Sequence, residues 1–140
     1  MKTTILILLC LSNLLNADFT RNADTGIVTD NTTHLQWQDD NISESMTWQE
    51  GIEYCEALHL GDYNDWRLPN INELDSLVDD TTLSPAIDSA FENTIVIDYW
   101  SSTSSPKNAI LAWHVYFNTG IKYYSNKISN YYIRCVRKGK

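Results

Sequence analysis

The chain has 140 residues and a formal net charge of −8, with 43% apolar and 20% charged residues. This composition excludes a disordered chain, and the low content of Gly and Pro excludes a fibrous protein. The acidic total argues against a generic nucleic-acid binder, and the length suits a single domain. All 18 acidic residues lie within residues 1–98, whereas the charged residues of 99–140 are all basic. These bases are Lys107, Lys122, Lys127, Arg134, Arg137, Lys138 and Lys140.

The N-terminus has the pattern of a secretory signal peptide. Lys2 gives it a positive start, residues 5–11 are an unbroken apolar run, and Ala17 is a small residue suited to signal peptidase. The run is shorter than the roughly 20 residues that span a bilayer. We therefore expect a cleaved signal at residues 1–17 and one domain at residues 18–140, exported to the periplasm, the cell surface or the medium. An uncleaved anchor or a lipoprotein is the alternative.

The cysteine count fits export. Cleavage after residue 17 removes Cys10 and leaves only Cys55 and Cys135. In an oxidising compartment an even pair favours a disulfide. A bridge over 80 positions would restrict the unfolded chain by about 4–5 kcal/mol on the loop-entropy model. Two buried free thiols are the alternative.

The first half of the domain predicts a hairpin and two helices. Residues 26–38 read as two short strands around a polar turn. The clearest helix runs over residues 47–60, because Thr47 and Glu50 form a capping box, apolar residues recur at helical spacing, and Gly61 follows. A second helix follows Pro69, with Asn70 as its N-cap. Its apolar face is formed by Ile71, Leu74, Leu77 and Val78.

From residue 94 onward the apolar period changes to two, which predicts strands. Trp113, Val115 and Phe117 alternate with more polar neighbours, and residues 118–120 form a turn. Residues 121–126 continue the alternation, and residues 131–136 make a last strand. Strands on both sides of a helical middle predict an α+β fold.

Six short strings occur in a fixed order along the chain. They are Leu35 to Gln38, Thr47-Trp48 ahead of Cys55, Asp65 to Asn70 with Glu73-Leu74, Tyr99 to Thr103, Ala112-Trp113 with Val115 and Phe117, and Tyr132 to Arg137. In this order they resemble the bacterial Lcl C-terminal domain family, which takes its name from the Legionella collagen-like adhesin, over about residues 26–137. That family is similar to C-type-lectin-like and sulfatase-modifying-factor domains.

The resemblance implies a C-type-lectin-like architecture. Two helices would pack on a small twisted antiparallel sheet, the chain ends would be adjacent, and the first and last strands would be neighbours. A disulfide from the first helix to the last strand is typical of such domains. Cys55 and Cys135 match those two places.

The resemblance also implies an adhesive function. We expect a domain that binds an extracellular polymer, either an anionic polysaccharide or a surface protein, although the fold hosts many unrelated roles. A structural or assembly module of the cell envelope is the alternative. The third and weakest alternative is a hydrolase or modifying enzyme. We expect no enzyme, because the related modifying enzymes use additional cysteines and the Gly-x-Ser-x-Gly elbow is absent. The residue types of a catalytic triad do occur, since Ser101 and Ser102 lie near Asp98 in the sequence and His114 follows.

No cofactor is expected, and the pattern for a metal site is weak. The three histidines lack the spacing of a zinc site. Asp39-Asp40, Asp62 with Asp65, and Asp79-Asp80 offer oxygen ligands for calcium, but no EF-hand loop is present, and solvated surface acids are the ordinary interpretation. Arg67 is more simply explained as the partner of an acidic residue in a structural ion pair.

The basic second half of the chain provides the candidate binding surface. Six of the 8 tyrosines lie there beside Ser and Asn, a composition typical of adaptable recognition surfaces. Aromatic rings stack on sugars, and lysines bind sulfate or carboxylate groups. The candidate ligand-binding residues are Tyr116, Lys122, Tyr123, Tyr124, Asn126, Lys127 and Tyr131. The alternative is that the tyrosines only cover a small sheet, since strand alternation turns one face outward. No nucleic-acid partner and no membrane span are expected.

Overall fold

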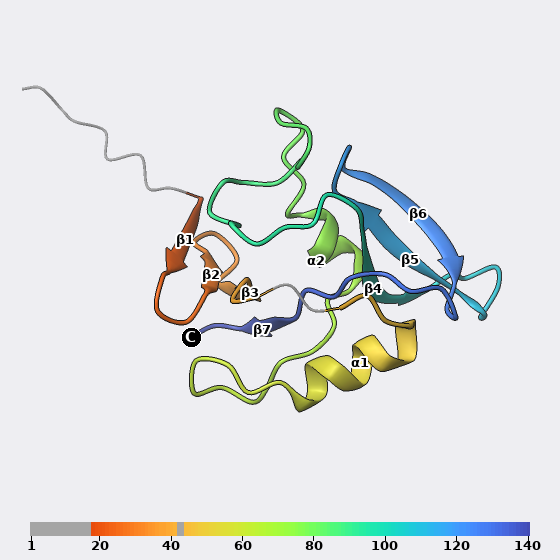
Figure 1. Ribbon diagram of the computed structural model, residues 1–140, viewed down its shortest axis with the longest axis horizontal. Coiled ribbons are helices and arrows are strands. Elements are labelled where there is room, and N and C mark those ends of the chain that lie inside the picture. Colours follow the sequence, from red (N-terminus) through yellow and green to blue (C-terminus); the bar gives the residue numbers. More distant parts are fainter. Residues whose placement is uncertain (1–17, 42–43) are drawn as a thin grey trace, which may run out of the picture.

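The computed structural model describes residues 18–41 and 44–140, so the predicted signal peptide at residues 1–17 lies outside the described residues. The elements in chain order are β1 (Phe19–Asn22), β2 (Ile27–Asp30), β3 (Leu35–Gln38), α1 (Trp48–Ala57), α2 (Ile71–Asp75), β4 (Asp98–Ser104), β5 (Leu111–Tyr116), β6 (Ile121–Asn126) and β7 (Val136–Lys138). One sheet has the strand order β1-β2-β3-β7 and the other the order β4-β5-β6, and all pairs are antiparallel (Figure 1). The α+β class with two helices is confirmed, but the strands form two sheets.

Both ends of the described chain lie in the four-stranded sheet (Figure 1). β7 pairs with β3, so that Trp37 lies opposite Val136. The expected pairing of the first strand with the last is wrong, because β1 occupies the outer edge against β2. β1 has half-buried and exposed residues in alternation and no fully buried one, which explains why no apolar pattern marks it in the sequence. The C-type-lectin-like likeness itself stays a prediction.

The two predicted helix starts are confirmed. Thr47 and Asn70 each accept a hydrogen bond from the backbone N–H three residues later, and the Glu at that position accepts one from the backbone N–H of the cap residue. Each capping box therefore satisfies donors that the first helical turn leaves free. The helix α2 lies beside β4 and β5 (Figure 1), and the backbone N–H of Ile71 donates to the hydroxyl of Thr103 in β4 at 3.0 Å.

The helix ends differ from the prediction. α1 ends at Ala57, and Gly61 instead occupies a two-residue turn between Leu60 and Tyr63. Gly61 and Asp62 have φ values of 62° and 65°. Positive φ at both central residues is the geometry of a type I′ hairpin turn, which glycine adopts without steric cost. The glycine signal was therefore real, but Gly61 marks a tight turn and lies four residues beyond the last helical residue, Ala57.

Two apolar clusters hold the sheets and helices together. One contains Trp37, Leu74 and Phe117, and the other surrounds the disulfide with Trp66 and Trp100. The Cys55–Cys135 disulfide joins α1 to the residue just before β7, and both cysteines are fully buried. The predicted bridge is thus present in the structure, and the free-thiol alternative does not apply.

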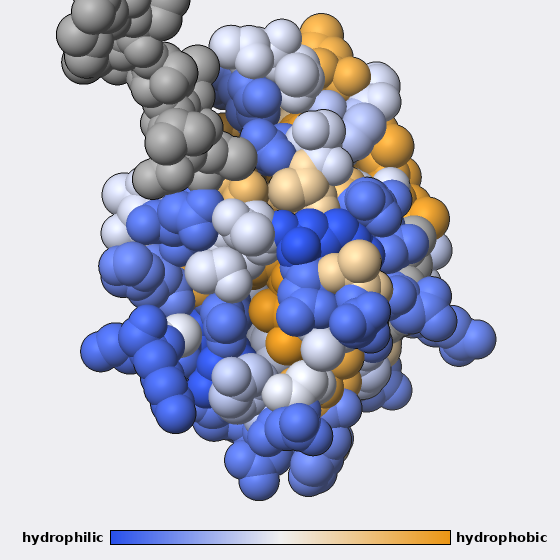
Figure 2. Space-filling model, turned by 90° about the vertical axis from the view of Figure 1, so that its left-hand side faces the viewer, coloured by the Kyte–Doolittle hydropathy of each residue, from blue (hydrophilic) through white to orange (hydrophobic). Residues whose placement is uncertain are grey.

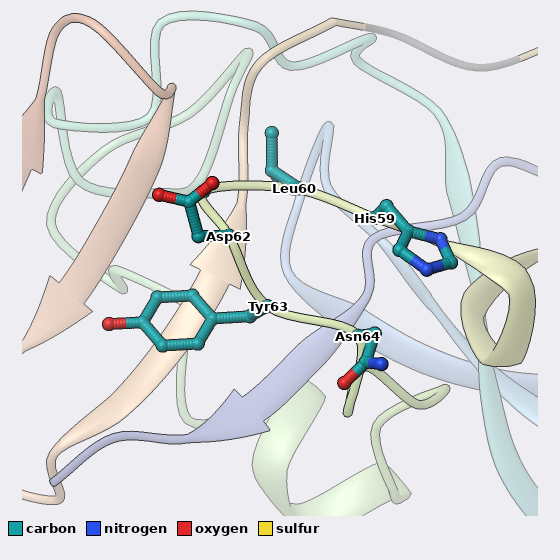
Figure 3. A pocket seen from close by; sticks show the side chains of 6 residues that line it. His59, Leu60, Asp62, Tyr63 and Asn64 are labelled. Atoms are coloured by element: carbon teal, nitrogen blue, oxygen red, sulfur yellow. The ribbon is translucent and has the colours of Figure 1, made fainter.

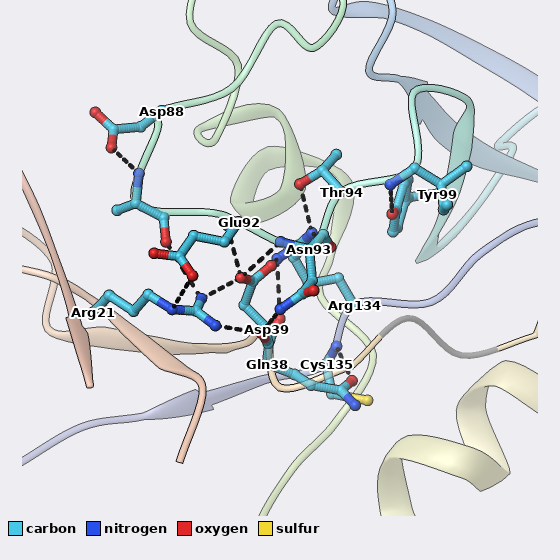
Figure 4. Close-up of polar contacts among 12 residues, drawn as sticks. Arg21, Gln38, Asp39, Asp88, Glu92, Asn93, Thr94, Tyr99, Arg134 and Cys135 are labelled. Atoms are coloured by element: carbon cyan, nitrogen blue, oxygen red, sulfur yellow. Dashed lines mark hydrogen bonds and ion pairs between the residues drawn. The ribbon is translucent and has the colours of Figure 1, made fainter. Parts of the chain in front are cut away.

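Asp39, the residue that directly follows β3, is the centre of a buried polar cluster (Figure 4). Its carboxylate is bound by the guanidinium groups of Arg21 and Arg134 and accepts the backbone N–H groups of Glu92 at 2.9 Å and Asn93 at 3.1 Å. The side chain of Asp39 is 0% exposed and that of Arg134 is 3% exposed. Buried charges persist only when they are paired and hydrogen-bonded. The cluster therefore ties β1, β3, the loop before β4 and the chain segment before β7 into one framework.

The string from Asp65 to Asn70 forms a second part of this framework. Trp66 is buried, while the backbone of Arg67 exchanges two 2.9 Å hydrogen bonds with Val136 and so covers the outer edge of β7. The guanidinium of Arg67 donates to both carboxylate oxygens of Glu73 at 2.7 Å. These bonds lower the pKa of Glu73. The predicted structural ion pair of Arg67 is present, although the arginine side chain is 47% exposed.

Candidate functional site

The bases of the second half do not gather into one positive patch. Arg134 lies in the Asp39 cluster, and Arg137 is buried against Asp65, to which its Nε donates at 2.6 Å. The hydrogen bond from Arg137 holds the pKa of Asp65 below its ordinary value. The ammonium of Lys122 lies 2.7 Å from a carboxylate oxygen of Asp75. The ammonium of Lys127 lies 3.9 Å from the ring centroid of Trp48 and donates to Ser104. Each of these four bases is therefore held by a partner within the domain.

The predicted binding residues divide between the two faces of the β4-β5-β6 sheet. Lys122 lies opposite Val115 and Tyr124 opposite Trp113, on the face that α2 covers. Asn126 belongs to the same face by strand alternation, although its side-chain oxygen accepts from the backbone of Ile128. Tyr116, Tyr123 and Tyr131 lie on the opposite face, and Lys127 lies beyond the end of β6. Of the predicted set, Lys122 lines a cavity, and Tyr124 packs on Trp113, which lines the same cavity.

A row of polar side chains lies on that opposite face. A carboxylate oxygen of Asp98 is 2.7 Å from Nδ1 of His114, and Nε2 of His114 is 2.9 Å from Oγ of Ser125. Tyr131 donates to the same Oγ at 3.0 Å. The sequence had indicated Asp98 and His114 beside Ser101, but the hydroxyl of Ser101 donates to the carbonyl of Trp113 instead.

The order Asp98, His114, Ser125 is that of a hydrolase triad, but the geometry does not support catalysis. Nδ1 of His114 makes no directed hydrogen bond despite its short distance to Asp98. The imidazole is buried, with the ring of Tyr131 at 4.6 Å and that of Trp100 at 5.6 Å. A base and nucleophile act only where a substrate atom can reach both. We therefore read this row as part of the packing of the sheet face.

A shallow groove opens between the first turn of α2 and the outer part of β5 and β6. It has a volume of about 260 Å³ and is lined by Ile71, Asn72, Trp113 and Lys122. The ring of Tyr124 packs edge-to-face against Trp113, with centroids 5.1 Å apart, and Tyr124 is 52% exposed. We call these five residues the Trp113 groove. It combines an apolar, aromatic floor with a few polar groups, which is the usual composition of a small-ligand site.

A larger cavity of about 450 Å³ lies at the turn after α1. It is lined by six consecutive residues, His59 to Asn64. The side chains of His59, Asp62 and Asn64 point in different directions from this turn (Figure 3). Specific binding needs polar groups that converge on one ligand. The cavity is therefore a weaker candidate than the Trp113 groove, despite its size.

An acidic cavity of about 420 Å³ lies beside β1 and includes Asp18, Asp79, Asp80 and Asp88. Hydrogen bonds from Thr81 lower the pKa of Asp79. Among the residues that the structure describes, no group of three or more His, Cys, Asp or Glu is arranged to hold a metal ion. The expectation of no metal and the alternative of calcium both stay predictions. Asp39 and Asp65 of the other acidic pairs are bound by arginines.

The surface at the four-stranded end of the molecule is mainly hydrophilic, with hydrophobic residues in a narrow central strip and along one edge (Figure 2). This view faces the left-hand side of Figure 1, where β1, β2 and β3 lie. By contrast, β6 at the other end has four consecutive exposed residues, including Tyr123 and Tyr124. The exposed aromatic side chains of β6 thus lie at the end that carries the Trp113 groove.

A comparison of the sequence with known protein families finds a match over most of the chain. The Lcl C-terminal domain family matches residues 26–137. The chain belongs to this family. Lcl C-terminal domains are associated with adhesins rather than with a known enzyme family, which suggests binding to extracellular partners. Membership and the disulfide together fit an exported protein. A search among curated proteins finds no match.

Within the described ranges, no helix is long and apolar enough to cross a membrane.

Sequence reasoning missed Ile71 and Asn72 as groove residues, because their pattern indicated only the start of a helix. It placed Trp113 on an alternating strand but not among the candidate binding residues, whereas the structure leaves this side chain half-buried at the groove. The period-two alternation does place Trp113 and Val115 on one face, but it does not reveal that α2 leaves one end of that face open.

Proposed function

We propose that this Lcl C-terminal domain is a non-enzymatic binding domain that engages an extracellular polymer at the Trp113 groove. The observation that carries the proposal is the exposed ring of Tyr124, packed edge-to-face on Trp113 beside a concave surface. Tyrosine and tryptophan supply large contact areas with few rotatable bonds, so little conformational entropy is lost when they bind a ligand. Their mutual contact further restricts both rings before binding.

The polar groups of the groove support the same function. Lys122 and Asp75 form an ion pair at its rim, and the side chain of Asn72 lies in its lining. A polymer needs only one or two of its units in such an open groove, while the rest of the polymer passes over the surface. The modest volume of about 260 Å³ therefore suits a unit of a longer molecule better than an enclosed small metabolite.

The test is binding of the purified exported chain to immobilised polysaccharides and extracellular-matrix proteins. Tyr124→Ala should weaken binding about tenfold or more, because hot-spot aromatic residues contribute at least about 2 kcal/mol. Tyr123→Ala is the matched control, since Tyr123 is 47% exposed on the same strand but faces the other side. Binding to none of these polymers, or equal losses in both variants, would refute the proposal.

A second candidate function is assembly with a protein partner, and the position of β6 favours it. β6 is the last strand of its sheet and pairs only with β5. An exposed edge strand is a template for an added strand from another chain. If β6 binds a protein partner, Tyr123→Lys should disrupt that binding. Tyr124→Ala should then impair polymer binding only and leave binding to the protein partner intact. High salt weakens only a charge-led contact, so the two variants separate a protein partner from a neutral polymer and salt does not.

A further inference from the structure

We infer that the Trp113 groove selects an uncharged sugar ring over a sulfated or carboxylated one. The inference rests on the proposed function, because it names the chemical class of the ligand at that same groove. It differs from the expectation of an anionic glycan that the seven late bases raise when the sequence is read alone. The reason for the difference is where the structure places four of those bases and what pairs with them: Lys122, Lys127, Arg134 and Arg137.

The first step concerns the charge of the groove itself. Lys122 is the only base that lines the groove among the described residues, and its ammonium lies 2.7 Å from the carboxylate of Asp75. An anionic ligand would have to compete with Asp75 for this ammonium. It would also approach the carboxylate of Asp75, which repels it. The pair thus brings a formal charge near zero to the rim of the groove.

The second step concerns hydrogen bonding. A paired lysine keeps further N–H donors, and the carboxylate keeps further acceptor positions. The side chain of Asn72 adds an amide, which both donates and accepts. Sugar hydroxyl groups also act as donors and acceptors at once. A rim that offers both kinds of group therefore matches a neutral polyol better than a sulfate, which only accepts.

The third step concerns the aromatic rings. Trp113 and Tyr124 stand nearly perpendicular, at an interplanar angle of 81°. The face of an aromatic ring carries partial negative charge, so it attracts C–H groups and disfavours anions. A pyranose has an apolar face of C–H groups that can lie on one ring. Its hydroxyl groups at the edge then extend toward Lys122 and Asn72.

The surroundings of the groove point the same way. Arg134 and Arg137 are buried in internal ion pairs, and Lys127 is held over Trp48. These bases therefore add little positive potential to the outer surface, while the chain as a whole has a net charge of −8. An acidic protein repels polyanions at long range. A neutral polymer meets no such barrier.

The experiment compares matched neutral and sulfated polymers. Dextran, mannan and galactan, each with its sulfated derivative of equal length, are titrated with the purified chain at 50 and 500 mM NaCl. We expect at least one neutral polymer to bind at least tenfold more tightly than its sulfated derivative, with less than a twofold change between the two salt concentrations. Tighter binding of the sulfated forms with a steep loss in salt would overturn the inference and leave the proposed function intact. Binding of neither class would overturn the inference, and the proposed function falls with it only when the extracellular-matrix proteins also fail to bind.

Variants of Lys122 and Asp75 separate hydrogen bonding from charge. Lys122→Gln keeps a donor at the groove but removes the charge, so it should weaken binding of the neutral polymer several-fold less than Lys122→Ala, which removes both. Asp75→Asn leaves Lys122 without its counter-charge, so binding of the sulfated polymer should rise at least threefold. A loss of neutral binding above tenfold in Lys122→Gln, with an unchanged circular dichroism spectrum, would show that the charge is required and would overturn the inference.

Discussion

Replacement of Asp39 by Asn tests whether the buried cluster holds the domain together. The Asp39 carboxylate is 0% exposed and is bound by two guanidinium groups and two backbone N–H groups. Asn keeps the shape but removes the charge, and its amide presents N–H donors to neighbours that are all donors. Arg134, which is 3% exposed, is then left as a buried charge without an anionic partner.

Removing one partner of a buried ion pair costs about 3–5 kcal/mol. A domain of this size has a total stability of roughly 5–15 kcal/mol, so the loss is a large fraction of it. Arg134 retains its hydrogen bonds to the carbonyl groups of Gln38 and Asn93 and to the hydroxyl of Thr94. Those bonds place the expected cost toward the lower end of the range. We expect the melting temperature of Asp39→Asn to fall by roughly 10 °C or more.

The assay is urea unfolding followed by tryptophan fluorescence, with the disulfide intact in every variant. The double variant Asp39→Asn, Arg134→Met removes both members of the pair and should recover part of the loss, because the uncompensated charge is gone. Asp40→Asn is the matched control, since Asp40 is the exposed neighbour. A cost below about 1 kcal/mol for Asp39→Asn, or additive losses in the double variant, would show that the cluster does not act as described.

Three further results are expected. The Cys55→Ser, Cys135→Ser variant should lose about 4–5 kcal/mol of unfolding free energy, because the bridge closes a loop with a sequence separation of 80 residues. An unchanged urea midpoint would contradict this. Because Arg67 lowers the folded-state pKa of Glu73, the stability that the pair contributes is present at neutral pH and is lost as the pH falls below the ordinary value of 4.5. The difference in urea midpoint between wild type and Glu73→Gln should therefore be largest near pH 7 and should decrease as the pH falls toward pH 3. Gly51→Ala should be destabilising by up to about 2 kcal/mol in urea unfolding. The added Cβ would lie 2.3 Å from Cδ1 of the buried Ile133, and an overpacking cost of about 1–3 kcal/mol is offset by about 1 kcal/mol of helix propensity. A partial recovery in Gly51→Ala, Ile133→Val would identify that contact as the cause.

Local rules predicted much of the fold. The capping residues Thr47 and Asn70 fixed where the helices start, since a cap depends on residues only three positions apart. The period of two identified β5 and β6 for the same reason. β1 was missed, because its residues become half-buried only through contacts with β2 and other distant parts of the chain. The division of the strands into two sheets was also missed, because strand order depends on pairing across long separations.

The candidate site was predicted less well, and the reason is geometric. The sequence grouped Lys122, Tyr123 and Tyr124 because they are consecutive, yet strand alternation turns Tyr123 away from the other two. It also listed Arg134 and Arg137 among the seven late bases without locating their partners. The acids that bind them, Asp39 and Asp65, are 95 and 72 positions away in the chain. No local pattern reveals an ion pair over such separations, so composition overstated the positive surface.

The residues that carry the family resemblance build the framework, whereas most of the groove lies outside them. Arg134, Trp66 and Cys135 belong to the strings shared with the family, and each is buried in the Asp39 cluster or the core. Of the five residues of the Trp113 groove, only Trp113 belongs to such a string. The first turn of α2 and the outer strand β6 supply the rest. Family membership therefore constrains the fold of this domain more strongly than its ligand, and the ligand must be argued from Asn72, Lys122 and Tyr124 of this chain.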